Sequence, residues 1–459
     1  MSGQVFIDDR KARNMHKFTV ALVLSSIMLS SCTKKQDAQT PPALLEKDQL
    51  TLGFIKLTDC APLVVAKELG FFEDEGLNVS LQAQANWKVL LDRVIDGQLD
   101  GAHMLAGQPL GAALGIGTQA DIVVPVSLDL NGNAITLSND VWKQVKASIP
   151  LEGGKPKQPI SASVLKEPAQ TANRKGTPLK FGMVFPVSTH NYQLRYWLAA
   201  GGLNPGQYTK DDVNGNTGAD VLLSVTPPPQ MPATLEAGTI NGYSVGEPWN
   251  QQAVAKGIGV PVITSRDIAQ GHAEKVLGLR ADFAAKNPNT TVAMVKAILR
   301  AQKWLDDPAN RPQAVSYLAR AEYVGADSAV IANSMTGTFE YEKGDVRPVP
   351  DFNVFWNQDA SFPFYSDAVW YLTQMRRWGQ IPEAKSDSFY LAVAKKVYQP
   401  DVWRKAADAL VADGLLQASE VTHAGDGFRP ATSAFIDGIP FDGRTPSAYL
   451  KSLPLGNKE

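Results

Sequence analysis

The chain has 459 residues, with 44 basic and 46 acidic residues, a formal net charge of −2 and an apolar fraction of 44%. This length is enough for two hydrophobic cores, and the evenly mixed charge excludes both the basic stripe of a nucleic-acid-binding protein and an acidic solvating tail. After residue 32, no apolar run approaches the roughly 18 residues that a membrane-spanning helix needs.

The N-terminal segment has the layout of an export signal. From Met15 it reads MHKFTVALVLSSIMLSSCTKK, a short basic start followed by apolar or small residues that end in Leu-Ser-Ser-Cys. This ending resembles a bacterial lipobox, in which Cys32 becomes the acylated first residue after cleavage. We therefore predict a signal peptide and lipobox over residues 1–32, with Met1 or Met15 as the start of translation and a buried N-terminal helix as the alternative. Residues 33–48 are polar and contain prolines, which predicts a tether.

The second cysteine has no partner if Cys32 carries lipid, so no disulfide framework is available. Cys60 lies in the apolar-rich stretch DCAPLVVAKELGFF. It is predicted to be a small buried apolar residue, and the alternative is a nucleophile.

Short β-type runs alternate with helix-type runs from residue 50 to about 262. Strands are predicted in LTLGFIKL, NVSLQAQ, GAHML, DIVVPVSLDL, KFGMVFPVS, DVLLSV and INGYSV, and helices in APLVVAKELGFFEDEG, WKVLLDRVIDG, PLGAALGIG, Tyr192–Ala200, MPATLEAG and WNQQAVAKG. This alternation is the signature of parallel sheets with helices on both faces, so the predicted fold class is α/β.

The alternating elements form two sets, joined near LNGNAITLSND and again near GVPVITSRD, which predicts two lobes linked by crossing strands. The polar, Gly- and Pro-rich stretch 152–178 is predicted to be a surface insertion. After about residue 281 the apolar spacing becomes helical. The predicted lobe 1 comprises residues 49–130 and 263–459, including the C-terminal helices, and the predicted lobe 2 comprises residues 131–262.

The helix starts indicate where a ligand would bind. In open parallel sheets, ligands lie beyond the carboxyl ends of the strands, where unpaired N–H groups and the helix dipole favour an anion. Asn86, Ser188 and Thr189 are typical N-caps, and Pro109 and Pro248 suit a first turn. For these five residues, capping is the simplest explanation.

Four other residues at helix starts are not caps, and each carries an N–H on a planar group: Trp87, Gln108, His190 and Trp249. A protonated histidine is unfavourable at the positive end of a helix dipole, so His190 makes sense if an anion faces it and accepts its hydrogen bond. The alternatives are a core role for Trp87 and simple surface exposure for His190.

Two further candidates lie outside the helix starts. Asn131 and Asn133, in LNGNAI, stand beside the predicted lobe crossover, and we take Asn131 as a ligand contact with a simple turn as the alternative. Lys256 would be a counter-ion only if its helix turns it inward.

Several long motifs resemble the nitrate- and bicarbonate-binding proteins of bacterial ABC importers. They are APLVVAKELGFFEDEGLNV, NW at 86–87, VSTHNYQLRYWLAAGG, PPPQMPATLEAGTINGYSVGEPWN and KWLDDPANRP, and the resemblance runs from about residue 50 to 400. It implies a two-lobed periplasmic-binding-protein fold of class II with added C-terminal helices, closing on a small planar oxyanion. It also implies Trp87, His190 and Asn131 as anion ligands, with the family's lysine near Lys256.

The same resemblance implies a lipid-anchored periplasmic protein that delivers its anion to permease and ATPase subunits. Carboxylates look scattered along the sequence, in place of the fuller acidic set for the calcium that can accompany bicarbonate. This favours nitrate, or nitrite, and predicts no metal and no cofactor. Nitrate is flat and only accepts hydrogen bonds, whereas bicarbonate has one O–H donor and would need an acceptor such as Glu247 or Asp59.

Two rival classes remain alternatives. GIGTQA at 115–120 mimics a dinucleotide-binding fingerprint but precedes a strand where it should follow one, and none of the common catalytic motifs is present. An enzyme similar to the thiamine-pyrimidine synthases, a related branch of this fold, conflicts with an export signal. A nitrate sensor that holds a signalling partner should lack that signal. We therefore predict a transporter component and no enzyme.

Overall fold

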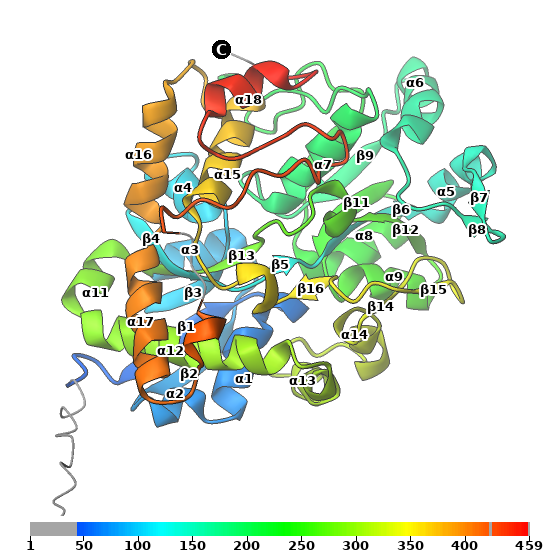
Figure 1. The fold of residues 1–459 in the computed structure, drawn as a ribbon. Helices are drawn as coiled ribbons and strands as arrows, with labels where there is room; N and C mark the ends of the chain where they lie inside the picture. Colours follow the sequence, from blue (N-terminus) through cyan, green and yellow to red (C-terminus); the bar gives the residue numbers. More distant parts are fainter. Residues whose placement is uncertain (1–43, 422–424, 458–459) are drawn as a thin grey trace, which may run out of the picture. The chain divides into compact units, whose positions relative to one another are not determined.

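The computed structural model describes residues 44–421 and 425–457, and two five-stranded sheets form its framework (Figure 1). The predicted signal peptide, its lipobox residue Cys32 and the tether up to residue 43 lie outside the described residues. Within the described part of the chain, no helix is both long and apolar enough to cross a bilayer.

The first sheet has the strand order β2-β1-β3-β13-β4. β1 pairs in parallel with β2 and β3, whereas β13 runs antiparallel to both of its neighbours. Its strands are β1 (Gln49–Phe54), β2 (Asn78–Ala83), β3 (Gly101–Leu105), β4 (Ile122–Ser127) and β13 (Lys275–Arg280), and the helices connecting the first four strands are α1 (Ala61–Glu68), α2 (Phe71–Asp74), α3 (Trp87–Ile95) and α4 (Gln108–Ala113).

The second sheet has the order β10-β9-β11-β6-β12, with β6 antiparallel to β11 and β12. Its elements are β6 (Asn133–Ser138), β9 (Lys180–Met183), α7 (Thr189–Ala200), β10 (Leu222–Val225), α8 (Met231–Glu236), β11 (Gly242–Gly246), α9 (Trp249–Lys256) and β12 (Gly259–Thr264). The predicted insertion contains the hairpin β7 (Leu151–Glu152) and β8 (Lys155–Pro156) and the helix α6 (Lys166–Arg174), and α5 (Asn139–Val145) precedes it.

Local sequence explains why the strands and helices form where they do. β3 and β11 are buried along their whole length, as expected for continuous small and apolar strands covered on both faces. In α3, Trp87, Leu90, Leu91 and Val94 are buried at helical spacing. The Asn86 side chain caps this helix by accepting a hydrogen bond from the Val89 N–H, as predicted.

Two short segments, 128–132 and 265–274, carry the chain between the sheets and lie beside each other. The Leu128 N–H donates to the Lys275 carbonyl at 2.7 Å, and the Asn131 N–H donates to the His272 carbonyl at 3.0 Å. Gly132 has a φ of +87°, and a Cβ there would lie 2.3 Å from the Asn353 amide nitrogen, so only glycine fits. The two crossings therefore form one closely packed connection.

The C-terminal half is mainly helical, as predicted. Its elements are α10 (Ser265–Ile268), α11 (Ala281–Lys286), α12 (Pro288–Leu305), α13 (Arg311–Leu318), α14 (Ser328–Met335), β14 (Thr338–Glu340), β15 (Val346–Pro348), α15 (Tyr365–Arg377), α16 (Asp387–Val397), α17 (Pro400–Ala412) and α18 (Pro446–Ser452). α12 packs on α1 and α17, while α15 contacts α4 and α7. A short pairing of β5 (Leu130–Asn131) with β16 (Asn353–Val354) braces the first crossing.

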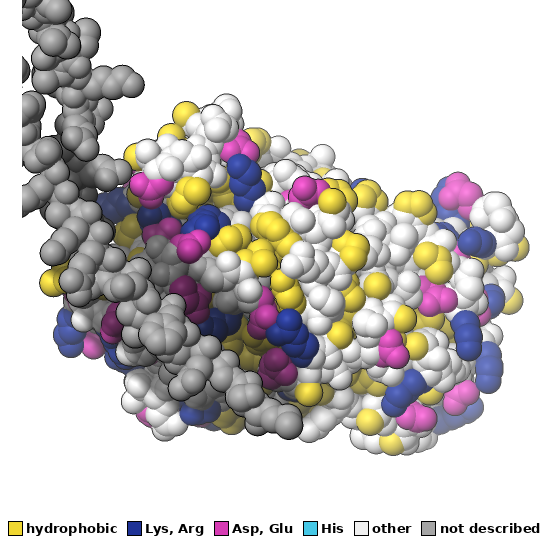
Figure 2. All heavy atoms as spheres, turned by 90° about the horizontal axis from the view of Figure 1, so that it is seen from below, with side chains coloured by type: hydrophobic (Ala, Val, Ile, Leu, Met, Phe, Trp, Pro, Cys, Tyr) yellow, Lys and Arg dark blue, Asp and Glu magenta, His cyan; other side chains and the backbone are white. Residues whose placement is uncertain are grey.

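The surface carries both signs of charge. On the face drawn in Figure 2, acidic and basic side chains are interspersed among scattered apolar ones, as the balanced composition predicts. The three histidines among the described residues behave differently, because His103 and His190 are 0% exposed and His272 is 7% exposed. A buried histidine ring needs polar neighbours. For His103 and His190 these neighbours lie between the two sheets.

Candidate functional site

Two of the predicted helix-start residues bury a polar group that has no hydrogen-bond partner among the described residues. Trp87 is the first residue of α3, and its indole Nε1 is unpaired. His190 is the second residue of α7, and neither of its ring nitrogens makes a hydrogen bond. Both side chains are 0% exposed. Because nearly all buried polar groups in proteins are paired, these two indicate a missing partner.

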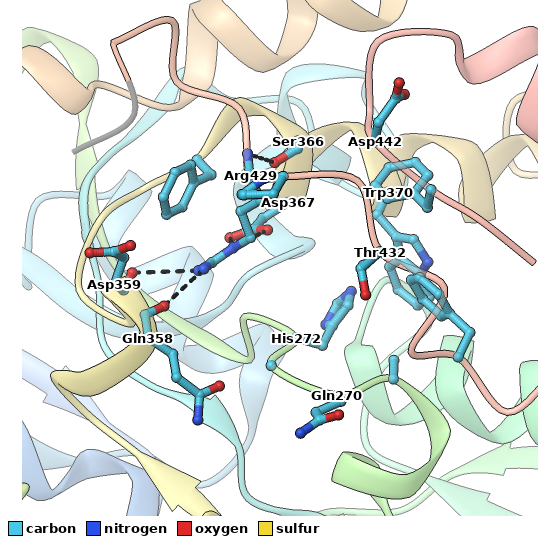
Figure 3. A pocket seen from close by; sticks show the side chains of 16 residues that line it. Gln270, His272, Gln358, Asp359, Ser366, Asp367, Trp370, Arg429, Thr432 and Asp442 are labelled. Atoms are coloured by element: carbon cyan, nitrogen blue, oxygen red, sulfur yellow. Dashed lines mark hydrogen bonds and ion pairs between the residues drawn. The ribbon is translucent and has the colours of Figure 1, made fainter. Parts of the chain in front are cut away.

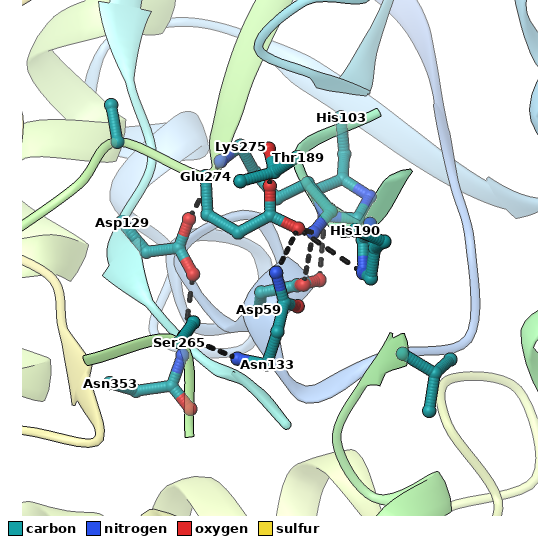
Figure 4. Close-up of polar contacts among 12 residues, drawn as sticks. Asp59, His103, Asp129, Asn133, Thr189, His190, Ser265, Glu274, Lys275 and Asn353 are labelled. Atoms are coloured by element: carbon teal, nitrogen blue, oxygen red, sulfur yellow. Dashed lines mark hydrogen bonds and ion pairs between the residues drawn. The ribbon is translucent and has the colours of Figure 1, made fainter. Parts of the chain in front are cut away.

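A buried lysine provides the positive charge of this region (Figure 4). Lys275 is the first residue of β13, and its ammonium lies 2.6 Å from Asp59 Oδ2, 2.5 Å from Glu274 Oε1 and 5.7 Å from the centre of the Trp87 ring. Burial lowers the pKa of Lys275, but Asp59, Glu274 and Asp129 more than reverse this, and the pKa is raised overall. Lys275 is therefore charged.

Asp59 is the carboxylate that balances this charge. It follows β1 in a short turn, is 1% exposed, and accepts hydrogen bonds from Lys275 and, at 2.8 Å, from His103 Nε2 on β3. Burial raises the pKa of Asp59, but Lys275 and His103 outweigh burial and lower it below its ordinary value. Burial keeps the pKa of the His103 ring lowered in spite of Asp59, so the ring is neutral.

The two other carboxyl groups of the cluster are held toward their neutral forms. Burial raises the pKa of Asp129 well above its ordinary value, and the nearby Asp59 raises it further. Burial also raises the pKa of Glu274, which Lys275 only partly offsets. The pKa of His190 is lowered well below its ordinary value by burial and by Lys275. The cluster therefore holds the Lys275–Asp59 ion pair among groups whose charged forms are disfavoured by burial.

Side chains from the second sheet complete the cluster around Glu274. The Asn133 amide on β6 donates to Glu274 Oε1 at 2.9 Å, and the Thr189 hydroxyl on α7 lies 2.5 Å from Glu274 Oε2. His190 Nε2 lies 3.3 Å from Glu274 Oε1. Residues of both sheets and of both crossing segments therefore meet at one buried cluster, which contains the Lys275 ammonium and the unpaired ring nitrogens of Trp87 and His190.

Two of the predicted planar donors use their N–H elsewhere. The Gln108 amide donates to the Trp87 carbonyl at 2.8 Å, so it positions α3. The Trp249 indole donates to the Lys56 carbonyl at 3.0 Å, which joins the second sheet to the first. The single N–H of the Trp249 indole is thus already bonded within the protein, which speaks against the predicted ligand contact, whereas the Gln108 amide uses one of its two N–H groups on a backbone carbonyl.

The predicted asparagine and lysine positions are also corrected. The Asn131 amide donates to the Asp351 carbonyl, and its oxygen accepts from the Gly271 N–H, so both ends serve the crossing. Lys256 is exposed at the last turn of α9. The helix buries the face that carries Asn250, Ala253 and Val254, and Lys256 lies outside that face. Lys275 and Asn133 occupy the cluster instead.

The impression that carboxylates are scattered was wrong, since Asp59, Asp129 and Glu274 converge. They surround the Lys275 ammonium. In residues 44–421 and 425–457, no group of three or more His, Cys, Asp or Glu residues is arranged to hold a metal ion. The sequence signal for the carboxyl groups around Lys275 was the adjacent Glu-Lys pair in GHAEKVLGL, at the end of the second crossing. Sequence spacing alone does not distinguish such a pair from two exposed surface residues.

Two residues weighed in the sequence analysis are buried nearby. Cys60 is 0% exposed, and burial, with Asp59 adding to it, raises the pKa of its thiol well above the ordinary value, so it is a buried apolar residue as predicted. Glu247 accepts a hydrogen bond from the Gln251 N–H, and burial raises its pKa to about 8.

A cavity of about 260 Å³ lies beside the C-terminal segment (Figure 3). Arg429 is its positive group, but it is paired with Asp367 and donates to the Gln358 carbonyl. Asp442 also lines the wall, and burial lowers the pKa of His272 to about 3. Its arginine is paired and its histidine neutral, and the ring nitrogens of His272 and the Trp370 indole N–H have no hydrogen-bond partner among the described residues.

Comparisons with known proteins agree with this architecture. The model of the NMT1-like family matches residues 43–319. The nitrate/nitrite binding protein NrtA of Nostoc sp. PCC 7120 is 32% identical over 464 residues, which cover 95% of this chain and 97% of the relative. The crystal structure of the periplasmic nitrate-binding protein NrtA from Synechocystis PCC 6803 matches with a TM-score of 0.76 at 32% identity, covering 90% of this chain and 100% of that one.

Two longer relatives contain a similar segment. The nitrate import ATP-binding protein NrtC of Synechocystis sp. PCC 6803 is 38% identical over 417 residues, and the bicarbonate transport ATP-binding protein CmpC of Synechococcus elongatus PCC 7942 is 34% identical over 414 residues. Each alignment covers 90% of this chain and 56% of the relative. The chain therefore spans little more than half the length of these two proteins.

The chain forms two mixed sheets, crosses between them twice, and holds a buried polar cluster between them. This is the architecture of a periplasmic binding protein of class II. The fold prediction is confirmed. The chain belongs to the NMT1-like family, and most of its length is similar to the nitrate/nitrite binding proteins NrtA.

Proposed function

We propose that this chain is the solute-binding component of an ABC importer and that it captures nitrate, or nitrite, for an inner-membrane permease. The observation that carries the proposal is the buried Lys275 ammonium beside the unpaired N–H groups of Trp87 and His190. Similarity to the NrtA proteins supports the choice of anion. Three or four charge-assisted hydrogen bonds are enough for the roughly −8 kcal/mol of micromolar binding after the costs of ordering.

Capture occurs by closure of two lobes, 49–130 with 263–459 and 131–262, around the anion. Contacts between elements of the two lobes support this movement. The Thr58 N–H donates to the Glu247 carbonyl at 2.8 Å, and the Trp249 indole donates to the Lys56 carbonyl. Bonds between the lobes stabilise the closed arrangement, and closure on a ligand requires such differential stability.

The ligand set follows from the cluster. Trp87, His190 and Lys275 donate to the anion, while Asn133 and Thr189 orient the Glu274 side chain beside it. Gln108 positions Trp87 by donating a hydrogen bond to its backbone carbonyl. The proposed function is binding without catalysis, in line with the similarity to the NrtA binding proteins. No metal or cofactor enters the proposal.

The export signal and the lipobox residue Cys32 support a lipid-anchored protein in the periplasm, with permease and ATPase subunits as partners. A nitrate sensor would lack the anchor. Membrane fractionation of cells that express the full chain separates the two proposals, because the anchored protein is recovered with the membranes and Cys32→Ala releases it.

Bicarbonate is the second candidate, favoured by the carboxyl oxygens of Asp59 and Glu274 close to Lys275. An O–H group of the ligand could donate to one of them, which nitrate cannot do. Calorimetric titration of the domain after Cys32 with nitrate, nitrite and bicarbonate tests the choice. We expect micromolar nitrate binding and bicarbonate binding at least about tenfold weaker. Tighter bicarbonate binding would replace the first candidate with the second.

A further inference from the structure

Three short oxygen–oxygen contacts form a chain beside the anion donors. Glu274 Oε2 lies 2.5 Å from Thr189 Oγ1, Thr189 Oγ1 lies 2.6 Å from Tyr371 Oη, and Tyr371 Oη lies 2.6 Å from the Ala273 carbonyl oxygen. Oxygens approach this closely only with a hydrogen between them. The chain therefore requires three hydrogens.

The chain contains two hydroxyl groups, and these supply two hydrogens. The Ala273 carbonyl has none, so Tyr371 donates to it. Tyr371 in turn accepts from Thr189, which leaves the Thr189–Glu274 contact without a hydrogen unless Glu274 provides one. With an ionised Glu274, Thr189 would donate to Oε2 and its contact with Tyr371 would have no hydrogen; all three contacts are hydrogen bonds at once only when Oε2 of Glu274 carries a proton and donates to Thr189. Oε1 accepts from Lys275 and Asn133.

The charges around Glu274 lead to the same protonation state. The groups that face it are Lys275 on its own strand, Asp59 from the turn after β1, Asp129 from the first crossing, His190 from α7 and Tyr371 from α15. Lys275 and Asp59 cancel, and the other three are neutral. An ionised Glu274 would place a net negative charge directly beside a bound anion, in a site that excludes water.

We propose that Glu274 takes up a proton when the lobes close on the anion, so that one proton is captured with each nitrate. This inference rests on the proposed function. In the open form α7 and β6 withdraw Thr189 and Asn133 from Glu274, and its carboxyl group ionises in water. On closure, a proton from solvent binds Oε2, which then donates to Thr189, and no other bond is made or broken.

The pH dependence follows from the sign of the shift. Burial raises the pKa of Glu274 in the closed state above its ordinary value of 4.5, with Lys275 opposing the rise. Nitrate affinity is therefore highest below that ordinary pKa. It falls by about tenfold per pH unit between the open-state and closed-state pKa values, because one proton must be bound, and it is level again above the closed-state pKa.

Calorimetry with nitrate measures this coupling directly, because nitrate stays ionised across the range and every proton taken up belongs to the protein. Titrations from pH 5 to 9 (approximate limits set by the stability of the fold) are run in pairs of buffers with different ionisation enthalpies. We expect uptake that approaches one proton per nitrate within the falling range. Nitrate binding with no proton uptake and a flat affinity at every pH would overturn the inference and leave the proposed function intact. Absence of nitrate binding would overturn both.

Glu274→Gln identifies the proton's location, since its amide N–H₂ replaces the O–H that donates to Thr189. We expect this variant to remain folded and to bind nitrate with no pH slope and no proton uptake. Glu383→Gln is the matched control, because Glu383 is 80% exposed and pairs with Lys385 at the surface, and it should keep the slope. A Glu274→Gln variant that retains the full slope would contradict the assignment. An infrared band of a protonated carboxyl group that appears with nitrate, and is absent in Glu274→Gln, is the second readout.

Discussion

The helix starts at Trp87 and His190 differ from those at Gln108 and Trp249 in whether the side-chain N–H group already makes a hydrogen bond within the protein. All four residues follow a strand and carry a planar donor. At Gln108 and Trp249 that donor already bonds a backbone carbonyl, whereas at Trp87 and His190 it is buried and unpaired among the described residues. The first pair therefore stabilises the protein itself, and the second pair is available to a ligand.

An unpaired buried donor does not mark a ligand site without further evidence. Trp378 also buries an indole N–H with no hydrogen bond among the described residues, but its ring packs on Arg377 at 4.5 Å. A cation lies over both rings, but the cation over Trp87, Lys275, also contacts Glu274, and a second unpaired donor, His190, lies beside Glu274. The comparison teaches that a donor gains a binding role when a second unpaired donor and a cation belong to the same cluster.

Removal of that charge should have the largest effect. In Lys275→Met, Asp59 is left buried without its cation, which we expect to lower the free energy of unfolding by about 3–5 kcal/mol. Nitrate affinity should fall by about a hundredfold or more, because the ammonium is lost and Asp59 now repels the anion. Urea unfolding and calorimetry measure the two effects.

A second variant separates the two consequences. Lys275→Met combined with Asp59→Asn removes both charges and should recover much of the stability without recovering nitrate binding. Recovery of tight binding in the double variant would show that Lys275 contributes only to folding.

The unpaired donors should come next in size. Trp87→Phe keeps the apolar ring and removes the indole N–H, and we expect nitrate affinity to fall by about tenfold, since a hydrogen bond to a charged group contributes roughly 1.5–3 kcal/mol. His190→Ala should weaken binding by at least a similar factor. Calorimetry of variants whose melting temperatures match the parent makes the measurement, and unchanged affinity in both would remove these residues from the site.

The paired donor at α9 should matter less. Trp249→Phe loses one hydrogen bond to the Lys56 carbonyl, which joins the lobes, so closure should weaken by about 0.5–1.5 kcal/mol and affinity by a few fold. Solution X-ray scattering with and without nitrate reports the closure. A loss as large as that of Trp87→Phe would mean that the Trp249 indole also contacts the anion.

The exposed lysine should have the smallest effect. Lys256→Gln removes a surface charge at the end of α9, and we expect nitrate affinity to stay within about a factor of two. A tenfold loss measured by the same calorimetry would restore the sequence-based assignment of the lysine.

Sequence patterns predicted much of this fold because parallel strands and helix caps leave local signals. The strand GAHML is β3 itself, and Asn86 and Ser188 cap α3 and α7 as their residue types predict. The elements without such signals were missed, such as β13, whose run KVLGLR follows a crossing and lies antiparallel between strands distant in sequence.

The candidate site was only partly predictable for a related reason. Trp87 and His190 lie at helix starts, which places them near the edges of the sheets. A helix start is recognisable from neighbouring residues, so these two positions could be predicted from sequence. Whether an N–H is already bonded depends on distant carbonyls, such as Lys56 for Trp249, which lie far apart in sequence. The Lys275 ammonium reaches the site through the packing of two crossings, which no local periodicity encodes.

A crystal structure of the nitrate-loaded domain tests the central claim most directly. The account predicts one nitrate between the sheets, within hydrogen-bond distance of Trp87 Nε1, a ring nitrogen of His190 and Lys275 Nζ. Nitrate bound elsewhere, with the first two nitrogens still unpaired, would contradict it.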